Sequence, residues 1–166
     1  GTMLDDECIA LMVKAGTYYV PTLSTVNGYI ERLAANPGAY SPTVRAKVEW
    51  RIKVTGQSLQ KAVPKGVKIA FGTDAGVSKH GRNADEFELM VKHGMTPATA
   101  LHAATVNAAD LLGLQADVGT LEPGKRAQRT VPGVQRIVAA RQAGGAALGD
   151  ELLVQFTNTP QPYRGA

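Results

Sequence analysis

The chain has 166 residues, of which 44% are hydrophobic and 19% charged, values typical of a globular domain rather than a disordered segment. Its net charge of +4 comes mostly from residues 126–166, which contain five arginines and two acidic residues. The sequence shows no basic run interleaved with aromatic residues, so the charge gives little support to nucleic-acid binding. A single cysteine, Cys8, excludes an internal disulfide and a cysteine-rich zinc module. No stretch is apolar for long enough to span a membrane, and no targeting segment is visible, which favours a cytoplasmic location.

The chain begins with a segment of helical periodicity. Apolar residues recur at helical spacing through residues 4–15, acids occupy the first turn, and Gly16 follows the end, as helix capping and helix electrostatics favour. Cys8 lies on the apolar side of this predicted helix, which favours a place in the core over a role as nucleophile. Residues 17–23 are aromatic and β-branched and predict a short strand that ends near Pro21.

A loop, a long helix and a second strand are expected next. Residues 24–41 contain the turn signals Asn-Gly and Asn-Pro-Gly and predict a loop. Residues 42–63 begin with proline and place apolar side chains along one side, which predicts one helix with Gly56 as a weak point in its middle. Residues 67–74 are typical of a buried strand, which ends in Asp74 and is followed by a glycine-rich loop.

Helices dominate the rest of the recognisable pattern. Asn83 precedes a helical stretch and Glu86 follows three residues later, a spacing that predicts a capping box at the start of this helix. Thr96, followed by proline, and Asn107 begin two further predicted helices. Strands that alternate with helices predict α/β units around a parallel sheet, and two strands with their helices make only part of such a fold.

Asp74 is the side chain with the clearest chemical potential. An acid that closes an apolar strand and precedes glycines lies at the carboxyl-terminal rim of a parallel sheet, where α/β barrels place their catalytic groups. There it either binds a cation or relays protons, or it simply caps the next turn. In the following loop, His80 either reaches a substrate over the rim or stays exposed, and Arg82 either binds a carboxylate or faces solvent.

The other two histidines indicate no metal site of their own. His93 ends a predicted helix, where the helix dipole stabilises a cation, and His102 lies in an alanine-rich run, so both are expected to be structural. The chain has no His-x-His or His-Glu-x-x-His spacing, no nucleophile elbow and no phosphate-binding glycine loop. The sequence therefore predicts no three-ligand zinc site of familiar spacing within this chain.

Eight short stretches follow one another in an order that is more specific than any one of them. They are GTMLDDE at 1–7, YVPTL at 19–23, FGTDAG at 71–76, HGRN at 80–83, GMTP at 94–97, ALHAAT at 100–105, NAADLLG at 107–113 and GTLEPGK at 119–125. The ordered set resembles the C-terminal part of metal-dependent amidohydrolases, and most closely their imidazolonepropionase-like and Xaa-Pro dipeptidase (prolidase)-like branch. The resemblance covers about residues 1–125.

The resemblance implies an incomplete α/β fold, the C-terminal part of a TIM-like (β/α)8 barrel. Residues 17–23 and 67–74 correspond to its seventh and eighth strands. Residues 1–113 are then expected to form the partial barrel, and residues 114–125 the start of the return to a small β-sandwich. The first six strands of such a barrel have no counterpart in this chain.

The resemblance also implies a metal-assisted reaction. In this family one or two divalent metal ions, here expected to be zinc, activate the water that attacks an amide or related C–N bond. Asp74 matches the family's aspartate, which is a metal ligand and takes the proton of that water, so it is expected to be both catalytic and metal-binding. His80 matches a loop histidine near the substrate, and Arg82 is a further substrate-binding candidate. The family's other ligands, including a histidine directly before the first motif, are absent, so the chain alone is expected to hold no metal stably.

Residues 126–166 depart from the family pattern. The family continues with Ala-Asp and a strand at this point, whereas here Ala127 is followed by Gln128. The segment is rich in alanine, glycine, arginine and glutamine and has no lysine. We therefore expect an irregular, atypical tail that is read out of frame or comes from a rearranged gene end, which translation of the coding DNA in all three frames would test.

Three functions are open at this point. The chain is a C-terminal fragment of a metal-dependent amidohydrolase, inactive by itself; or it is one subunit of a split amidohydrolase; or it is a small non-catalytic α/β protein with a binding or structural role. The intact enzyme is expected to act on a dipeptide, a cyclic amide or another small molecule. Neither nucleic acid nor membrane is an expected partner, and open sheet edges favour self-association.

Overall fold

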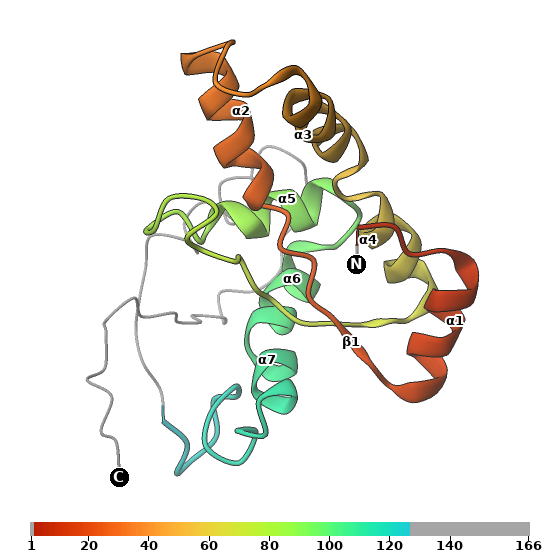
Figure 1. Ribbon diagram of the computed structural model, residues 1–166. Coiled ribbons are helices and arrows are strands. Elements are labelled where there is room, and N and C mark those ends of the chain that lie inside the picture. Colours follow the sequence, from red (N-terminus) through yellow and green to blue (C-terminus); the bar gives the residue numbers. More distant parts are fainter. Residues whose placement is uncertain (1, 127–166) are drawn as a thin grey trace, which may run out of the picture.

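The computed structural model describes residues 2–126, in which helices surround one short pair of strands (Figure 1). Residues 127–166, nearly all of the expected atypical tail, lie outside the described part. None of the described helices has the length and apolar character needed to cross a membrane. The elements are α1 (Asp6–Ala15), β1 (Tyr18–Tyr19), α2 (Thr25–Ala35), α3 (Pro42–Val54), α4 (Gln57–Ala62), a 3-10 turn (Val63–Lys65), β2 (Lys68–Ile69), α5 (Asp85–Lys92), α6 (Pro97–Ala104) and α7 (Val106–Leu111).

The two strands are parallel neighbours, as the alternation of strands and helices predicts. Tyr18 pairs with Lys68 and Tyr19 with Ile69. One further bond, from the N–H of Ala70 to the carbonyl of Tyr19 at 3.0 Å, extends the ladder. Both strands are shorter than predicted because a ladder lasts only while two segments stay alongside each other, and both bend soon after this point.

The edge of β2 that faces away from β1 is held by the last two helices. The side-chain amide of Asn107, in α7, donates to the carbonyl of Ile69 at 2.7 Å. The N–H of Phe71, just past β2, donates to the carbonyl of Ala103, in α6, at 3.0 Å. Backbone groups on a strand edge need partners, so these two bonds fix α6 and α7 beside the sheet.

The core lies where three helices meet the end of β1. Ile9 in α1, Leu59 in α4 and Met90 in α5 are fully buried, and so is Leu23, four residues after β1. Burying each such side chain contributes about 1.5–3 kcal/mol. Short helices of this kind are marginal by themselves, so their packing onto the strands is what holds them.

The predicted core position of Cys8 is wrong. Cys8 is exposed, and its neighbour Ile9 is the fully buried residue of α1. The carboxylate of Asp5 caps the helix by accepting the N–H of Cys8 at 2.8 Å, and Gly16 ends it with a φ of 65°, as predicted. The side chains of Ile9 and Met12, three residues apart in the helix, pack inward. The buried face of α1 is therefore rotated by one residue from the predicted face, which included Cys8.

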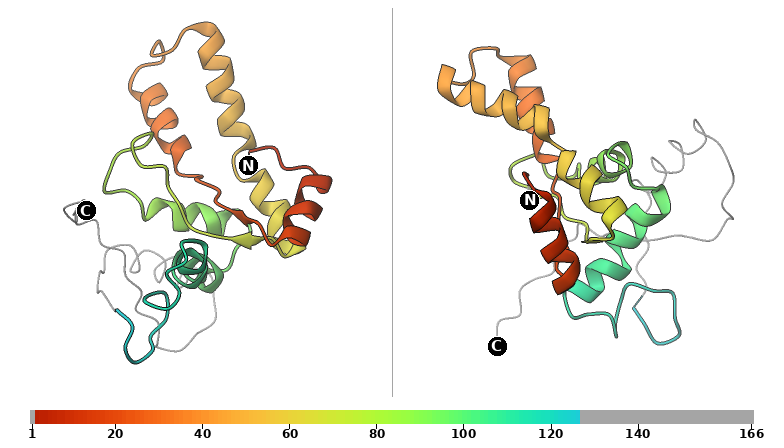
Figure 2. Two further views of the ribbon diagram at one scale, coloured as in Figure 1. Left: turned by 60° about the horizontal axis from the view of Figure 1, so that its bottom comes forward. Right: turned by 90° about the vertical axis from the view of Figure 1, so that its right-hand side faces the viewer.

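The predicted loop at 24–41 is also wrong, because most of it is α2. Thr25 and Val26 are buried at the start of this helix, and α2 packs against α3 in a projection that stands away from the other helices (Figure 2). The expected turn at Asn-Gly lies inside α2. Gly28 is suited to that place because a β-carbon there would lie 3.0 Å from the carbonyl oxygen of Val77.

The predicted single helix over 42–63 is two helices, α3 and α4, that separate at Gly56. Gly56 has a φ of 84°, which L-residues rarely adopt. The ring of His93 occupies the space beside it, since a β-carbon on Gly56 would lie 2.2 Å from the imidazole Nδ1. Burial lowers the pKa of His93, which favours the neutral ring and argues against the cation expected at this helix end.

Gly56→Ala is expected to lower the free energy of unfolding by about 3 kcal/mol, because alanine is strained at this φ and its methyl group would meet His93. Gly66→Ala is the matched control. Gly66 has a similar φ of 78° but open space beside it, so the change should cost only about 1 kcal/mol. Urea unfolding measures both values, and equal costs would show that the ring moves aside freely.

A polar cluster lies at the amino-terminal ends of the two strands, at the end of the sheet opposite to Asp74. The hydroxyl of Tyr18 donates to Asp110 at 2.5 Å. The Nζ of Lys68 lies 3.6 Å from the same carboxylate and 5.0 Å from the centre of the Tyr18 ring. The hydrogen bond to Asp110 raises the pKa of Tyr18 to about 12, because it stabilises the protonated phenol.

Asp110→Ala is expected to bring the pKa of Tyr18 down from about 12 toward its ordinary value of about 10, because the phenol loses its acceptor and a nearby negative charge. Phenolate absorbance against pH measures the change, with Tyr18→Phe used to assign the transition. Asp117→Ala, at an exposed aspartate outside this cluster, should leave the pKa of Tyr18 unchanged. A Tyr18 pKa that stays near 12 in Asp110→Ala would contradict this assignment.

Candidate functional site

Each strand is followed, at the same end of the sheet, by a residue in the left-handed backbone region. Thr22 has a φ of 47° and Asp74 a φ of 51°, and within residues 2–126 no other non-glycine residue has a positive φ. This conformation costs an L-residue about 1–2 kcal/mol, and aspartate visits it more readily than most. Strained residues concentrate at functional sites. The carboxyl-terminal rim of the two strands is therefore the candidate site.

Asp74 is exposed at this rim. Among the described residues its carboxylate has no hydrogen bond and no ion pair, and the turn that follows is closed by its backbone, whose carbonyl accepts the N–H of Val77 at 3.2 Å. The alternative role, a side chain that caps the next turn, is therefore not the one it has in the described part. His80 is also exposed, in the loop between Asp74 and α5.

The residue before Asp74 is held from two sides. The hydroxyl of Ser24 donates to the carbonyl of Thr73 at 3.4 Å, a long bond. The hydroxyl of Thr73 donates in turn to the side-chain oxygen of Asn83 at 3.2 Å. Ser24 follows β1 and Asn83 precedes α5, so the backbone that carries Asp74 is tied to both neighbouring segments.

Glu86 makes the most deeply buried polar contact of this region. Its side chain is 0% exposed, and its two carboxyl oxygens accept the N–H of Leu23 at 2.8 Å and of Ser24 at 2.6 Å. Burial raises the pKa of Glu86, and the N–H groups of Leu23 and Ser24, together with the Ser24 side chain, offset only part of that rise. Glu86 thereby joins the first turn of α5 to the turn after β1.

The predicted capping box of Asn83 and Glu86 is wrong. α5 begins at Asp85, one residue later than a cap at Asn83 requires, and its N-terminus has no side-chain cap. Glu86 turns inward because it shares the apolar face of the helix with Met90, one turn later and fully buried. An acid on the apolar side of a short helix was the sequence signal for a buried carboxyl group, and the capping interpretation missed it.

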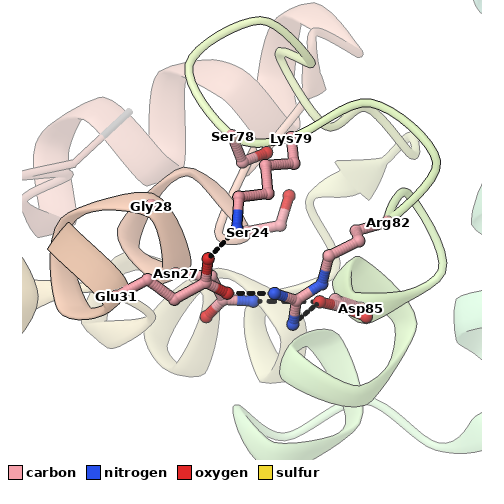
Figure 3. A pocket seen from close by; sticks show the side chains of 8 residues that line it. All are labelled: Ser24, Asn27, Gly28, Glu31, Ser78, Lys79, Arg82 and Asp85. Carbon is pink, nitrogen blue, oxygen red and sulfur yellow. Dashed lines mark hydrogen bonds and ion pairs between the residues drawn. The ribbon is translucent and has the colours of Figure 1, made fainter. Parts of the chain in front are cut away.

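Arg82 lies within a network of charges between the loop and α2 (Figure 3). Its guanidinium pairs with Glu31 and, at 2.6 Å, with Asp85, and Lys79 lies 3.2 Å from Glu31. The carboxylate of Asp85 raises the pKa of Arg82, and Lys79 and Arg82 together lower the pKa of Glu31. The crevice among these side chains has a volume of about 10 Å³, room for about one water molecule.

The described residues do not form a metal site by themselves. No three histidine, cysteine, aspartate or glutamate side chains in residues 2–126 come together in a way that could hold a metal ion. His93 packs against Gly56 and His102 is exposed on α6. A zinc site needs about three protein ligands, and the described part of the chain brings one exposed carboxylate, that of Asp74, to the rim without partners.

Glu86→Gln isolates the contribution of this carboxyl group to stability. Because the pKa of Glu86 is raised above 4.5 in the folded chain, the folded state holds the proton more tightly than the unfolded state does. The wild type should therefore lose stability relative to Glu86→Gln as the pH rises from about 4.5 through the folded pKa. Denaturant unfolding at a series of pH values measures this difference, and a relative gain over that range would contradict the raised pKa.

Comparison with known proteins gives one consistent relationship. The model of the amidohydrolase family matches residues 2–132. A crystal structure of a Xaa-Pro dipeptidase with bound methionine superposes with a TM-score of 0.70 at 42% identity, over 76% of this chain and 31% of that one. Ochratoxinase of Aspergillus niger is 35% identical over 74% of this chain and 25% of its own length. Imidazolonepropionase of Geobacillus kaustophilus is 40% identical over 43% of this chain and 18% of its own length.

These matches confirm the predicted resemblance and its branch. They also show that the described residues have part of a TIM-barrel-like α/β fold. The chain spans less than a third of the length of the curated relatives and solved structures that it matches. On the matched motifs, the parallel strands and the family model, the chain belongs to the amidohydrolase family.

Proposed function

We propose that this chain forms the last part of the catalytic barrel of a metal-dependent hydrolase that cleaves an amide-type C–N bond. In this proposal β1 and β2 are the seventh and eighth strands, residues 1–113 belong to the barrel, and residues 114–125 begin the return to a β-sandwich. Family membership and similarity to a Xaa-Pro dipeptidase and an ochratoxinase support it. The remaining strands and metal ligands come from protein outside this chain.

The position of Asp74 is the observation that carries the proposal. Asp74 lies five residues past the end of β2, the second of two parallel strands. It is exposed, and its backbone is held in an uncommon conformation with φ 51°. Its carboxylate is not engaged by any other described residue. A carboxylate at the rim of two parallel strands that no described residue engages favours a role in catalysis over a role in stability.

The chemistry follows from that placement. A carboxylate at the rim accepts a proton from a water molecule that attacks the substrate carbonyl, and then delivers the proton to the leaving nitrogen. Asp74 is the proposed proton carrier and one ligand of a divalent metal ion, which we take to be zinc. The described residues bring no three ligands together, so in this proposal the other ligands come from outside residues 2–126.

The loop after Asp74 is the proposed substrate-binding element of this chain. His80 is exposed in that loop, and no described residue competes for it. Arg82 already pairs with Glu31 and Asp85, so a substrate carboxylate would have to displace an existing partner. We therefore place His80 ahead of Arg82 as the residue that contacts a dipeptide or a similar small amide.

Exposed apolar side chains favour a chain that packs against further protein. Leu112 and Leu121 are 69% and 70% exposed, and Met3 is 75% exposed. Apolar surface of this kind commonly marks an interface. These residues favour an enzyme part, covalently continuous or one subunit of a split enzyme, over an independent non-catalytic protein. The same surface would promote self-association when nothing covers it.

The test is hydrolysis of Xaa-Pro dipeptides after this chain is combined with a polypeptide that supplies the first six strands of a related barrel. The assembly should hydrolyse the dipeptide and the chain alone should not. Asp74→Asn should reduce kcat by about 100-fold or more, because a general acid–base group is lost. Asp117→Asn, at an exposed aspartate away from the rim, is the control and should keep full activity. An active Asp74→Asn assembly would contradict the proposal.

A further inference from the structure

Glu86 is a buried carboxyl group to which the proposed reaction gives no task. It is 0% exposed, yet it lies at the start of the helix that follows the Asp74 loop. Taking a carboxyl group out of water is unfavourable unless it is fully hydrogen-bonded. Its two partners, the N–H groups of Leu23 and Ser24, are 63 and 62 residues away in the chain, so the bonds join segments that nothing local would bring together.

The residue that receives this contact also reaches Asp74. Ser24 is 2% exposed. Its N–H donates to Glu86 at 2.6 Å, and its hydroxyl donates to the carbonyl of Thr73 at 3.4 Å. The Thr73 carbonyl belongs to the peptide unit that carries the N–H of Asp74. Ser24 is thus the one residue of the turn after β1 that contacts both the buried carboxyl group and the backbone of the rim.

We propose that Glu86 is a positioning residue for Asp74: it holds the turn after β1, and through Ser24 it fixes the backbone from which the Asp74 side chain extends. The inference rests on the proposed function, in which Asp74 takes part in catalysis. Glu86 touches neither substrate nor reacting atoms. Its effect is on where the Asp74 carboxylate stands, and a displacement of about 1 Å at a catalytic group costs on the order of 100-fold in rate.

A positioning role and a purely structural role differ in what happens at Asp74 when Glu86 is changed. If Glu86 only stabilises the fold, Glu86→Gln lowers stability but leaves the Thr73–Asp74 peptide where it is. If Glu86 positions Asp74 through Ser24, Glu86→Gln displaces that peptide, and removal of the Ser24 hydroxyl displaces it too, although the N–H groups of Leu23 and Ser24 still donate to Glu86. Glu86→Gln therefore separates the two roles, and Ser24→Ala tests whether Ser24 transmits the effect.

The experiment is nuclear magnetic resonance of the full chain, with amide shifts and native-state hydrogen exchange compared for three variants. In Glu86→Gln, the amides of Leu23 and Ser24 should exchange about tenfold or more faster, because one of two strong acceptor bonds is lost. The amide signals of Thr73 and Asp74 should shift as well. In Ser24→Ala, the Leu23 amide should stay protected while Thr73 and Asp74 shift.

Glu88→Gln is the matched control, since Glu88 is an exposed acid two residues further along the same helix. It should change neither exchange at Leu23 and Ser24 nor the signals of Thr73 and Asp74. Unchanged Thr73 and Asp74 signals in Glu86→Gln, or in Ser24→Ala, would overturn the inference. If Glu86→Gln fails to fold, Ser24→Ala still tests the inference, because the N–H groups of Leu23 and Ser24 keep the buried carboxyl group paired.

A second measurement uses the assembled, active enzyme. Ser24→Ala should lower kcat about 10- to 100-fold and leave KM unchanged, because a displaced Asp74 impairs the chemical step and not substrate binding. Full kcat in Ser24→Ala would overturn the inference while the proposed function stands. An assembly that never hydrolyses an amide would overturn the proposed function, whereas the resonance experiment would still test whether Glu86 positions Asp74.

Discussion

The arrangement of this chain depends on one buried interaction, the acceptance of two backbone N–H groups by the carboxyl oxygens of Glu86. The bonds to Leu23 and Ser24 are 2.8 and 2.6 Å long and fully out of water. They fix α5 against the turn after β1, with Leu23 and Met90 packed in the core beside them. Without this contact the turn after β1 would lose its link to α5, and the strands by themselves pair over only two residues each.

The two ends of the strand pair differ in whether their polar side chains have partners. At the amino-terminal ends, Tyr18, Lys68 and Asp110 satisfy one another by a hydrogen bond, an ion pair and a cation–π contact. At the carboxyl-terminal ends, Thr22 and Asp74 have uncommon backbone conformations and Asp74 keeps its carboxylate exposed. Polar groups at one end are paired with one another, whereas the carboxylate at the other end is available. Barrel enzymes likewise use one end of the barrel for stability and the other for catalysis.

Sequence patterns predicted what depends on neighbouring residues. The parallel pair, the Gly16 cap and the start of α6 at Thr96 are confirmed, and Thr96 forms a capping box with Thr99. Asp74 follows the second strand as expected, but that strand ends at Ile69 and not at Asp74. The inward position of Glu86 and the helix at α2 were not predicted, and Gly56 was expected to weaken one helix but divides it into two. Each depends on a partner from a distant segment, such as Leu23, which no local spacing reveals. The sequence motifs also predicted the family correctly, because eight short motifs in a fixed order are more specific than any one of them.

The central claim is that this chain brings Asp74, and not a whole metal centre, to an amidohydrolase active site. Zinc content measured by elemental analysis tests it most directly, on the chain alone and after assembly with the missing part of a related barrel. The account predicts no stoichiometric zinc in the chain alone and about one or two zinc ions per assembled enzyme, lost or weakened in Asp74→Asn. Tight, stoichiometric zinc in the chain alone would contradict it.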